Sequence, residues 1–216
     1  MSSETAIAPR PLLRGYLHLI AAGGAPFALV FLVLAADSPR GVVGGALFGA
    51  SLVLLYSTSA VYHLLPMGRR VRGLVRRVDH SNIFLFIAGA YAPFALNLMS
   101  DRWGIPFLSV VGGLALVGLI VTVSAPSAPR WIRVGLYLAL GWIGIIPISE
   151  LIDALPLRAF ALLVLSGVLF SAGGAMYATR RPDPFPRVFG YHEVFHTLQL
   201  LATAIIYAVL VVYVLG

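Results

Sequence analysis

Long runs without charged residues, separated by short arginine-containing segments, dominate the sequence. Seven such apolar stretches can be delimited, approximately at 15–36, 43–66, 82–99, 103–125, 134–149, 159–178 and 191–215. Most of them approach the ~20 residues that a helix needs to cross ~30 Å of hydrocarbon. The fifth is the weakest, because Arg133 and Glu150 bracket it closely. The pattern predicts an all-α fold, a polytopic membrane protein built as a seven-transmembrane-helix bundle.

Composition supports a chain that lies in lipid. Of the 216 residues, 60% are hydrophobic and only 11% are charged, whereas a soluble domain carries roughly 25% charged residues. Too little polar surface is left to face water. The connections are short, so we expect one domain over 1–216, in which residues 1–14 form a short cytoplasmic segment.

The arginines predict the orientation. Lysine is absent, and twelve of the fifteen arginines fall before the first span or in every second connection after it. The other side holds only Arg40, Arg102 and Arg158. The positive-inside rule then places the amino terminus in the cytoplasm and the carboxyl terminus outside. Topology and contact with anionic lipids account for the net charge of +7, and we expect no nucleic-acid partner, since no basic-aromatic groove pattern is present.

Three glycine pairs stand inside the predicted spans, namely Gly44-Gly45, Gly112-Gly113 and Gly173-Gly174. Small residues at helix interfaces let two backbones approach closely in a membrane. We therefore expect all three pairs to line the interior of the bundle.

Ionisable residues from distant spans fall on one side of this topology. His63 lies near the cytoplasmic end of the second span, Asp79 and His80 begin the third, and His192 and His196 begin the seventh. Ionisable groups in membrane spans usually have a function. His192 and His196 are four residues apart and share a helix face. Cysteine is absent, so a tight transition-metal site must use histidine and carboxylate.

The pattern predicts a catalytic Zn²⁺ site with His63, His192 and His196 as ligands. Three protein ligands leave a fourth position for water, whose pKa zinc lowers toward ~7. Asp79 would orient that water and take its proton. Ser59, one turn before His63, could donate a hydrogen bond to a substrate carbonyl or its developing oxyanion.

Simpler interpretations exist for each residue. A single histidine near a helix end often sits half-solvated at headgroup level. Ser59 could bond back to a carbonyl one turn earlier. His80 points ~100° away from Asp79 on a helix, which favours a supporting or interfacial role. His18, in the first span, is a weaker ligand candidate than the other histidines, and Gln199 could support His196 from one turn away.

One short motif suggests a different enzyme. The segment from His192 to His196 reads H-E-x-x-H, in which zinc metalloproteases use the glutamate as general base. No His, Asp or Glu follows His196 to supply a third ligand downstream. Glu193 is expected at the membrane boundary, where a charge costs little. We therefore disfavour an intramembrane protease.

Taken together, these residues resemble the hemolysin III family, the bacterial branch of the progestin and adipoQ (adiponectin) receptor family. The resemblance extends over nearly the whole chain from Arg14 onward. One departure is Ala92, where family members more often have threonine. The matching motifs are Ser59-Ala-Val-Tyr-His63, Asp79-His80-Ser81-Asn82-Ile83-Phe84, Ala88-Gly89-Ala90-Tyr91-Ala92-Pro93, Gly173-Gly174-Ala175-Met176-Tyr177 and His192-Glu193-Val194-Phe195-His196.

The resemblance implies a zinc site. In that family three histidines bind zinc and an aspartate contacts the metal directly or through water, which here would be His63, His192, His196 and Asp79. The family topology has the amino terminus inside, in agreement with the arginines. The wider superfamily includes alkaline ceramidases, which cleave a lipid amide with a similar zinc centre.

We therefore expect a zinc-dependent hydrolase of lipid amide or ester bonds in the bacterial cytoplasmic membrane, which takes a membrane lipid laterally from the bilayer and serves lipid homeostasis. One alternative is a hemolysin-type protein that perturbs membranes, although the fourth and sixth spans show almost no polar stripe for a pore. Another is a non-enzymatic lipid sensor with structural zinc. An open fourth coordination position would favour chemistry, and a closed one would favour a structural role.

Overall fold

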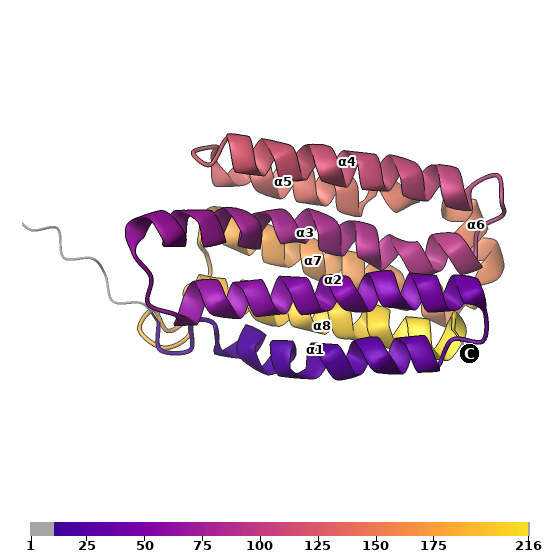
Figure 1. Ribbon diagram of the computed structural model, residues 1–216, viewed down its shortest axis with the longest axis horizontal. Helices are drawn as coiled ribbons and strands as arrows, with labels where there is room; N and C mark the ends of the chain where they lie inside the picture. Colours follow the sequence, from indigo (N-terminus) through magenta and orange to yellow (C-terminus); the bar gives the residue numbers. More distant parts are fainter. Residues whose placement is uncertain (1–10, 216) are drawn as a thin grey trace, which may run out of the picture.

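The computed structural model describes residues 11–215, and this part of the chain is helical without a β-strand. The long helices run up and down along one axis, each antiparallel to the next long helix (Figure 1). The fold class expected from the sequence is confirmed. The elements are α1 (Tyr16–Leu34), α2 (Pro39–Leu64), α3 (Arg69–Asn97), α4 (Gly104–Ser124), α5 (Arg130–Gly141), the 3₁₀ turn η1 (Ile143–Ile145), α6 (Ile148–Ala154), α7 (Leu157–Thr179) and α8 (Tyr191–Tyr213).

Most of the helices are suited to a membrane. Among the described residues, α1, α2, α4, α7 and α8 are each long and apolar enough to cross it, and the bent pair α5–η1 with α6 adds a sixth span if counted as one. The remaining long helix, α3, packs along α2 and α4. It begins at Arg69 rather than near residue 82, because the arginine-rich segment continues the helix instead of forming a loop. Arginine is a good helix former.

The predicted fifth span is broken. Helix α5 ends at Gly141, and α6 leaves it at an angle of 56°. Pro147 has no backbone N–H and interrupts the helical hydrogen bonds. Tyr91 of α3 satisfies backbone groups at the break: its hydroxyl donates to the Gly141 carbonyl and accepts from the Gly144 N–H at 3.2 Å. Where a backbone unwinds at membrane depth, other groups must supply the hydrogen bonds that the helix no longer makes.

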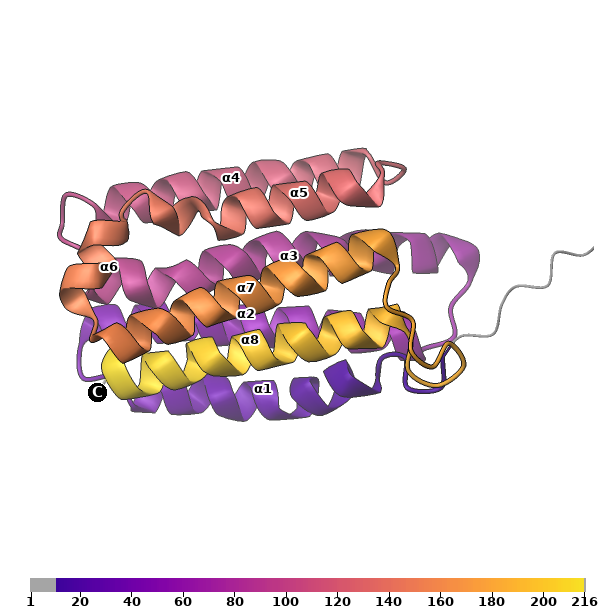
Figure 2. The same ribbon diagram turned by 180° about the vertical axis from the view of Figure 1, so that it is seen from behind.

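Two of the three glycine pairs lie between helices as expected. A Cβ on Gly44 would come within 2.6 Å of the Pro93 backbone, and Gly45 packs on Leu32. The pair in α7, Gly173-Gly174, packs on α8 and α5. The expectation for Gly112-Gly113 is wrong, because both face open space. Helix α4 lies at the edge of the bundle, and one whole side of it has no neighbour (Figure 2).

The basic segments share one end of the bundle. The segment before α1 and the connections α2–α3, α4–α5 and α7–α8 lie there, while the carboxyl terminus lies at the other end (Figure 1). Arg14 and the arginines of these connections therefore cluster as the alternation predicts. Arg10 and residues 1–10 generally lie outside the described part of the chain. Which end faces the cytoplasm stays a prediction.

Candidate metal centre

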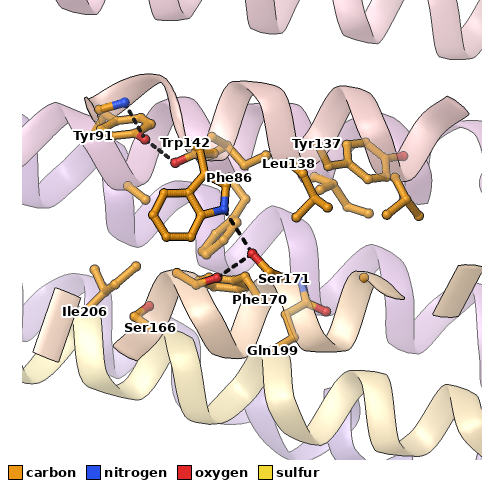
Figure 3. Close-up of a pocket in the computed structure, with 18 of the residues that line it drawn as sticks. Phe86, Tyr91, Tyr137, Leu138, Trp142, Ser166, Phe170, Ser171, Gln199 and Ile206 are labelled. Atoms are coloured by element: carbon orange, nitrogen blue, oxygen red, sulfur yellow. Dashed lines mark hydrogen bonds between the residues drawn. The ribbon is translucent and has the colours of Figure 1, made fainter. Parts of the chain in front are cut away.

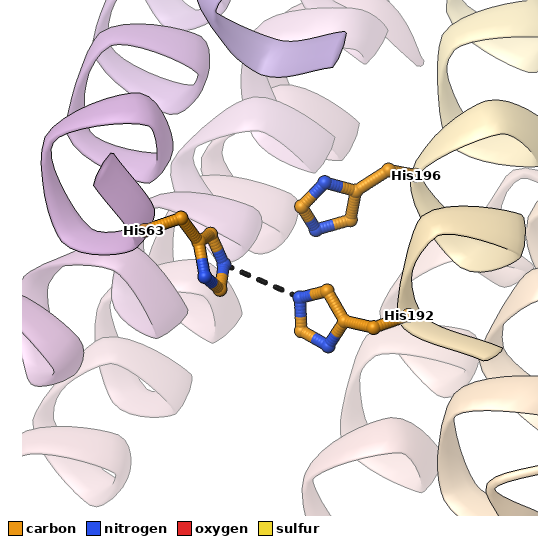
Figure 4. Close-up of side chains that lie close together, drawn as sticks. All are labelled: His63, His192 and His196. Carbon is orange, nitrogen blue, oxygen red and sulfur yellow. Dashed lines mark hydrogen bonds between the residues drawn. The ribbon is translucent and has the colours of Figure 1, made fainter. Parts of the chain in front are cut away.

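Three histidines from two helices converge at the basic end of the bundle. His63 comes from the last turn of α2, and His192 and His196 come from the first two turns of α8 (Figure 4). One ligand atom from each ring lies within 4.8 Å of the others. The ring centroids of His63 and His192 are 4.8 Å apart, and those of His192 and His196 are 4.5 Å apart. The sequence prediction that these three meet is confirmed.

Local sequence fixes the helix ends that carry these rings. Helix α2 ends in the extended residue Leu65, because a residue before proline, here Pro66, avoids the helical region. Helix α8 begins after Gly190, whose N–H donates to the Glu193 carboxylate in the first turn at 2.8 Å. Both ends are therefore defined sharply beside the histidines.

The donor set fits a metal ion. Two imidazole nitrogens bound tetrahedrally at 2.0–2.1 Å would lie ~3.3 Å apart, and the Nε2 atoms of His63 and His192 are 3.2 Å apart. His196 is buried at 4% exposure. Neutral imidazoles are the usual nitrogen ligands of zinc. The geometry supports a metal site but does not identify the ion.

Asp79 does not belong to the three-histidine cluster. Its carboxylate is buried on the wall of the adjoining cavity, and one oxygen lies 3.3 Å from His80 Nδ1. The other ring nitrogen of His80 is 3.4 Å from the Tyr177 hydroxyl, and the Tyr177 ring packs 5.5 Å from that of His192. Asp79 thus connects to the cluster through neighbours. Its roles as ligand and as base stay predictions.

Ser59 and Gln199 line the same cavity. Ser59 is 3% exposed and Gln199 is 4% exposed, each one turn from a cluster histidine. The position of Ser59 is compatible with the predicted contact to a substrate, and that of Gln199 with a supporting role beside His196. The role of Ser59 as hydrogen-bond donor stays a prediction.

A cavity of ≈ 290 Å³ extends from the histidines into the bundle. Apolar side chains of α3, α5, α7 and α8 form most of its wall, including Phe86, Leu138, Phe170 and Ile206 (Figure 3). Several wall residues are also exposed on the outside of the bundle, notably Trp142, Ile145 and Val164. The cavity therefore reaches the lateral surface beside α5–η1 and α7.

A polar bridge crosses this lateral opening. The Trp142 indole N–H donates to Ser171 Oγ at 2.9 Å, and Ser171 donates to the Gly167 carbonyl at 2.8 Å (Figure 3). Sequence reasoning missed both the cavity and this bridge. Their only signal is the pair of glycines around the break in the fifth span, Gly141 and Gly144.

Glu193 is not the exposed boundary residue that the sequence suggested. It is 1% exposed, and both of its carboxylate oxygens are engaged, one by Arg14 Nε and the other by the Gly190 N–H. A general base needs a free oxygen at the reacting site. The metalloprotease interpretation of the H-E-x-x-H segment therefore loses its base.

The fold and the site define a class: a polytopic helical membrane protein with a histidine cluster at one end of an apolar internal cavity. A model of the family described as Haemolysin-III related matches residues 7–207. The chain belongs to this family.

Named relatives agree with this assignment. The Hemolysin-3 homolog of Bacillus subtilis (strain 168) is 31% identical over 189 residues, covering 86% of this chain and 85% of the relative. Hemolysin-3 of Bacillus cereus is 30% identical and covers 87% and 84%. The Adiponectin receptor protein of Drosophila melanogaster is 28% identical over 77% of this chain and 41% of its own length.

Proposed function

We propose that this protein is a zinc-dependent membrane hydrolase that cleaves an amide or ester bond of a lipid. The observation that carries the proposal is the convergence of His63, His192 and His196 at the end of an apolar cavity. Ligand-binding cavities are typically concave and apolar with a few convergent polar groups. We place the protein in the bacterial cytoplasmic membrane, in a role in lipid homeostasis.

Each polar residue of the site would have a separate role. Bound zinc would supply a Lewis acid and an activated water molecule. The three imidazoles would hold the ion. The Asp79 carboxylate would accept the proton of the attacking water, and Ser59 Oγ would donate a hydrogen bond to the substrate carbonyl oxygen.

The apolar walls would bind the acyl chain. Burial of apolar surface contributes roughly 25 cal/mol per Å², which suits a lipid tail along Phe86, Phe170 and Ile206. The lateral opening beside Trp142 and Val164 would then face the lipid. Substrate would enter through it without crossing water.

Metal content and hydrolysis test the proposal together. Wild-type protein purified in detergent should contain one zinc per chain by elemental analysis, and His63→Ala, His192→Ala and His196→Ala should each lose it. Wild-type protein in lipid nanodiscs should release fatty acid from a ceramide or a phospholipid, detected by mass spectrometry. Full zinc occupancy in all three variants would refute the site. Metal-loaded protein that releases no fatty acid from either lipid would refute the hydrolase.

The printed names of the Bacillus relatives favour a second candidate, a protein that perturbs membranes. It predicts dye release from liposomes by wild-type protein. Equal release by His63→Ala would separate that activity from the metal site. No release at protein concentrations that saturate the liposomes would dismiss this candidate.

A further inference from the structure

A fourth histidine packs directly on the candidate metal centre without belonging to it. His18, in the first turn of α1, lies face to face with His196, with ring centroids 3.8 Å apart and planes 7° from parallel. It is 2% exposed, and neither of its ring nitrogens has a hydrogen-bond partner among the described residues. The Tyr56 ring contacts it from another side, with ring centroids 5.1 Å apart and planes at 64°.

We propose that His18 is a positioning residue of the metal centre, whose stacked ring fixes the plane of the His196 ring and so the direction of its ligating nitrogen. The inference rests on the metal site proposed above. The terminal torsion of a histidine is broad, so a ligand ring needs a further contact to hold its plane. Ligand histidines usually obtain it by donating the second N–H to a carboxylate or carbonyl.

His196 lacks that usual contact. The hydrogen bonds of residues 11–215 that involve a histidine ring are those of His80 with Tyr177 and of His192 with His63. The broad face of the His18 ring, at stacking distance, replaces the orienting hydrogen bond. A metal-bound imidazole also takes up part of the positive charge of the ion, which the π face of a neutral neighbouring ring attracts.

The backbone holds His18 in register with both ligand-bearing helices. Gly15, at φ 89°, lets the chain turn directly against the His63 side chain, where a Cβ would come within 2.6 Å. Arg14 pairs with Glu193 on α8. The residues directly before α1 are thus anchored on α2 and on α8, and His18 lies in the first helical turn that follows them.

Two substitutions of His18 test the effect of the aromatic face and that of the ring nitrogens separately. His18→Phe keeps an aromatic face and removes both nitrogens, whereas His18→Leu keeps a similar volume and removes the face. Zinc affinity of detergent-purified protein would be measured by competition with a chelator. The absorption spectrum of the Co²⁺-substituted protein would report the ligand geometry independently of any turnover. Gly113→Leu, on the open face of α4, serves as control.

The expected result is zinc affinity within about threefold of wild type and an unchanged cobalt spectrum for His18→Phe. For His18→Leu we expect a loss of about 10–100-fold, the range for residues that support metal ligands, and an altered spectrum. Thermal melting of the metal-free proteins would show that the variants fold. If His18→Leu does not fold, His18→Asn replaces it under the same criteria.

Three outcomes would count against the proposal. Wild-type affinity and spectrum in His18→Leu would overturn it and leave the metal site intact. Equal losses in His18→Phe and His18→Leu would show that the nitrogens matter rather than the stacked face. A wild-type protein that binds neither zinc nor cobalt would remove the proposed function itself, and the inference with it.

Discussion

Arg14 and Glu193 are 179 positions apart in the sequence and form an ion pair that fastens the segment before α1 to the first turn of α8. The same segment is bound to the α7–α8 connection, because the Leu12 and Leu13 N–H groups donate to the Arg187 and Val188 carbonyls at 3.0 and 3.1 Å. These contacts close the bundle end beside His192. We therefore expect the pair to stabilise the structure around the site rather than to take part in its chemistry.

Replacing Glu193 should lower stability without removing the metal. Glu193→Ala leaves the Arg14 guanidinium unpaired and the Gly190 N–H without its acceptor. We expect the free energy of unfolding to fall by about 3 kcal/mol. This is the low end for a broken buried pair, because the Arg14 side chain is 18% exposed. Glu193→Gln keeps an acceptor for Gly190 and should lose less. Thermal unfolding in detergent measures both.

Zinc content and hydrolysis test whether Glu193 also takes part in the chemistry. Folded Glu193→Ala should still carry zinc and still release fatty acid. If the variant keeps its metal and its melting temperature but loses hydrolysis, Glu193 takes part in the chemistry and the protease interpretation returns.

Gly15→Ala should disturb the metal centre from outside it. The left-handed conformation at φ 89° costs an alanine ~1–2 kcal/mol, and the new methyl group would stand 2.6 Å from His63 Cβ. We expect lower thermal stability and weaker zinc binding. Gly23→Ala, which meets nothing within 4 Å in the middle of α1, is the matched control and should be neutral or slightly stabilising. Identical behaviour of the two variants would contradict the argument.

The three-histidine cluster is predictable from sequence because two simple rules carry it. Alternating arginines put the ends of the second and seventh spans on one side, and a four-residue spacing puts His192 and His196 on one helix face. The arginine alternation is read from the whole chain and the four-residue spacing from a single helix, and neither needs knowledge of how the helices pack. The helical class follows from the apolar runs for the same reason.

Features that depend on helix rotation or on distant partners are not predictable in this way. The stack of His18 on His196 depends on how α1 turns about its axis, and the burial of Glu193 depends on Arg14. Gly112-Gly113 has the composition of an interface, yet α4 has no neighbour on that side. The lateral cavity lies beside the break after Gly141, where the sequence indicates only a short span.

Reporter fusions test the orientation. Arginine asymmetry predicts that the basic end of the bundle lies in the cytoplasm. Alkaline phosphatase fused after Gly216 should therefore be active, and green fluorescent protein at the same position should stay dark. Fusions placed in the α4–α5 connection, near Pro126, should show the opposite pattern. A fluorescent fusion at Gly216 would reverse the assignment and place the histidine cluster outside.

Asp79→Asn should separate metal binding from turnover. The amide keeps the shape of the side chain but cannot accept the proton of the attacking water, and removing a general base typically costs 10²–10⁴-fold in rate. Because Asp79 lies outside the three-histidine cluster, zinc should remain bound. Ser59→Ala should cost about 10²-fold in rate, the low end for the loss of a single oxyanion donor. Undiminished fatty-acid release by Asp79→Asn would remove this residue as the base.

Filling the lateral opening should select against long lipids. A Cβ on Gly167 would lie 3.3 Å from the Trp142 ring, in the wall of the cavity, so Gly167→Leu would narrow the passage between α5 and α7. We expect kcat/KM for a long-chain lipid to fall about tenfold, equivalent to ~1.4 kcal/mol, with zinc content unchanged. A short, water-soluble ester should be affected less, because it can reach the histidines without passing a tail through the opening. Gly113→Leu places the same side chain on the open face of α4 and should leave both rates alone. Equal hydrolysis of the long lipid by the two leucine variants would mean that substrate reaches the histidines by another route.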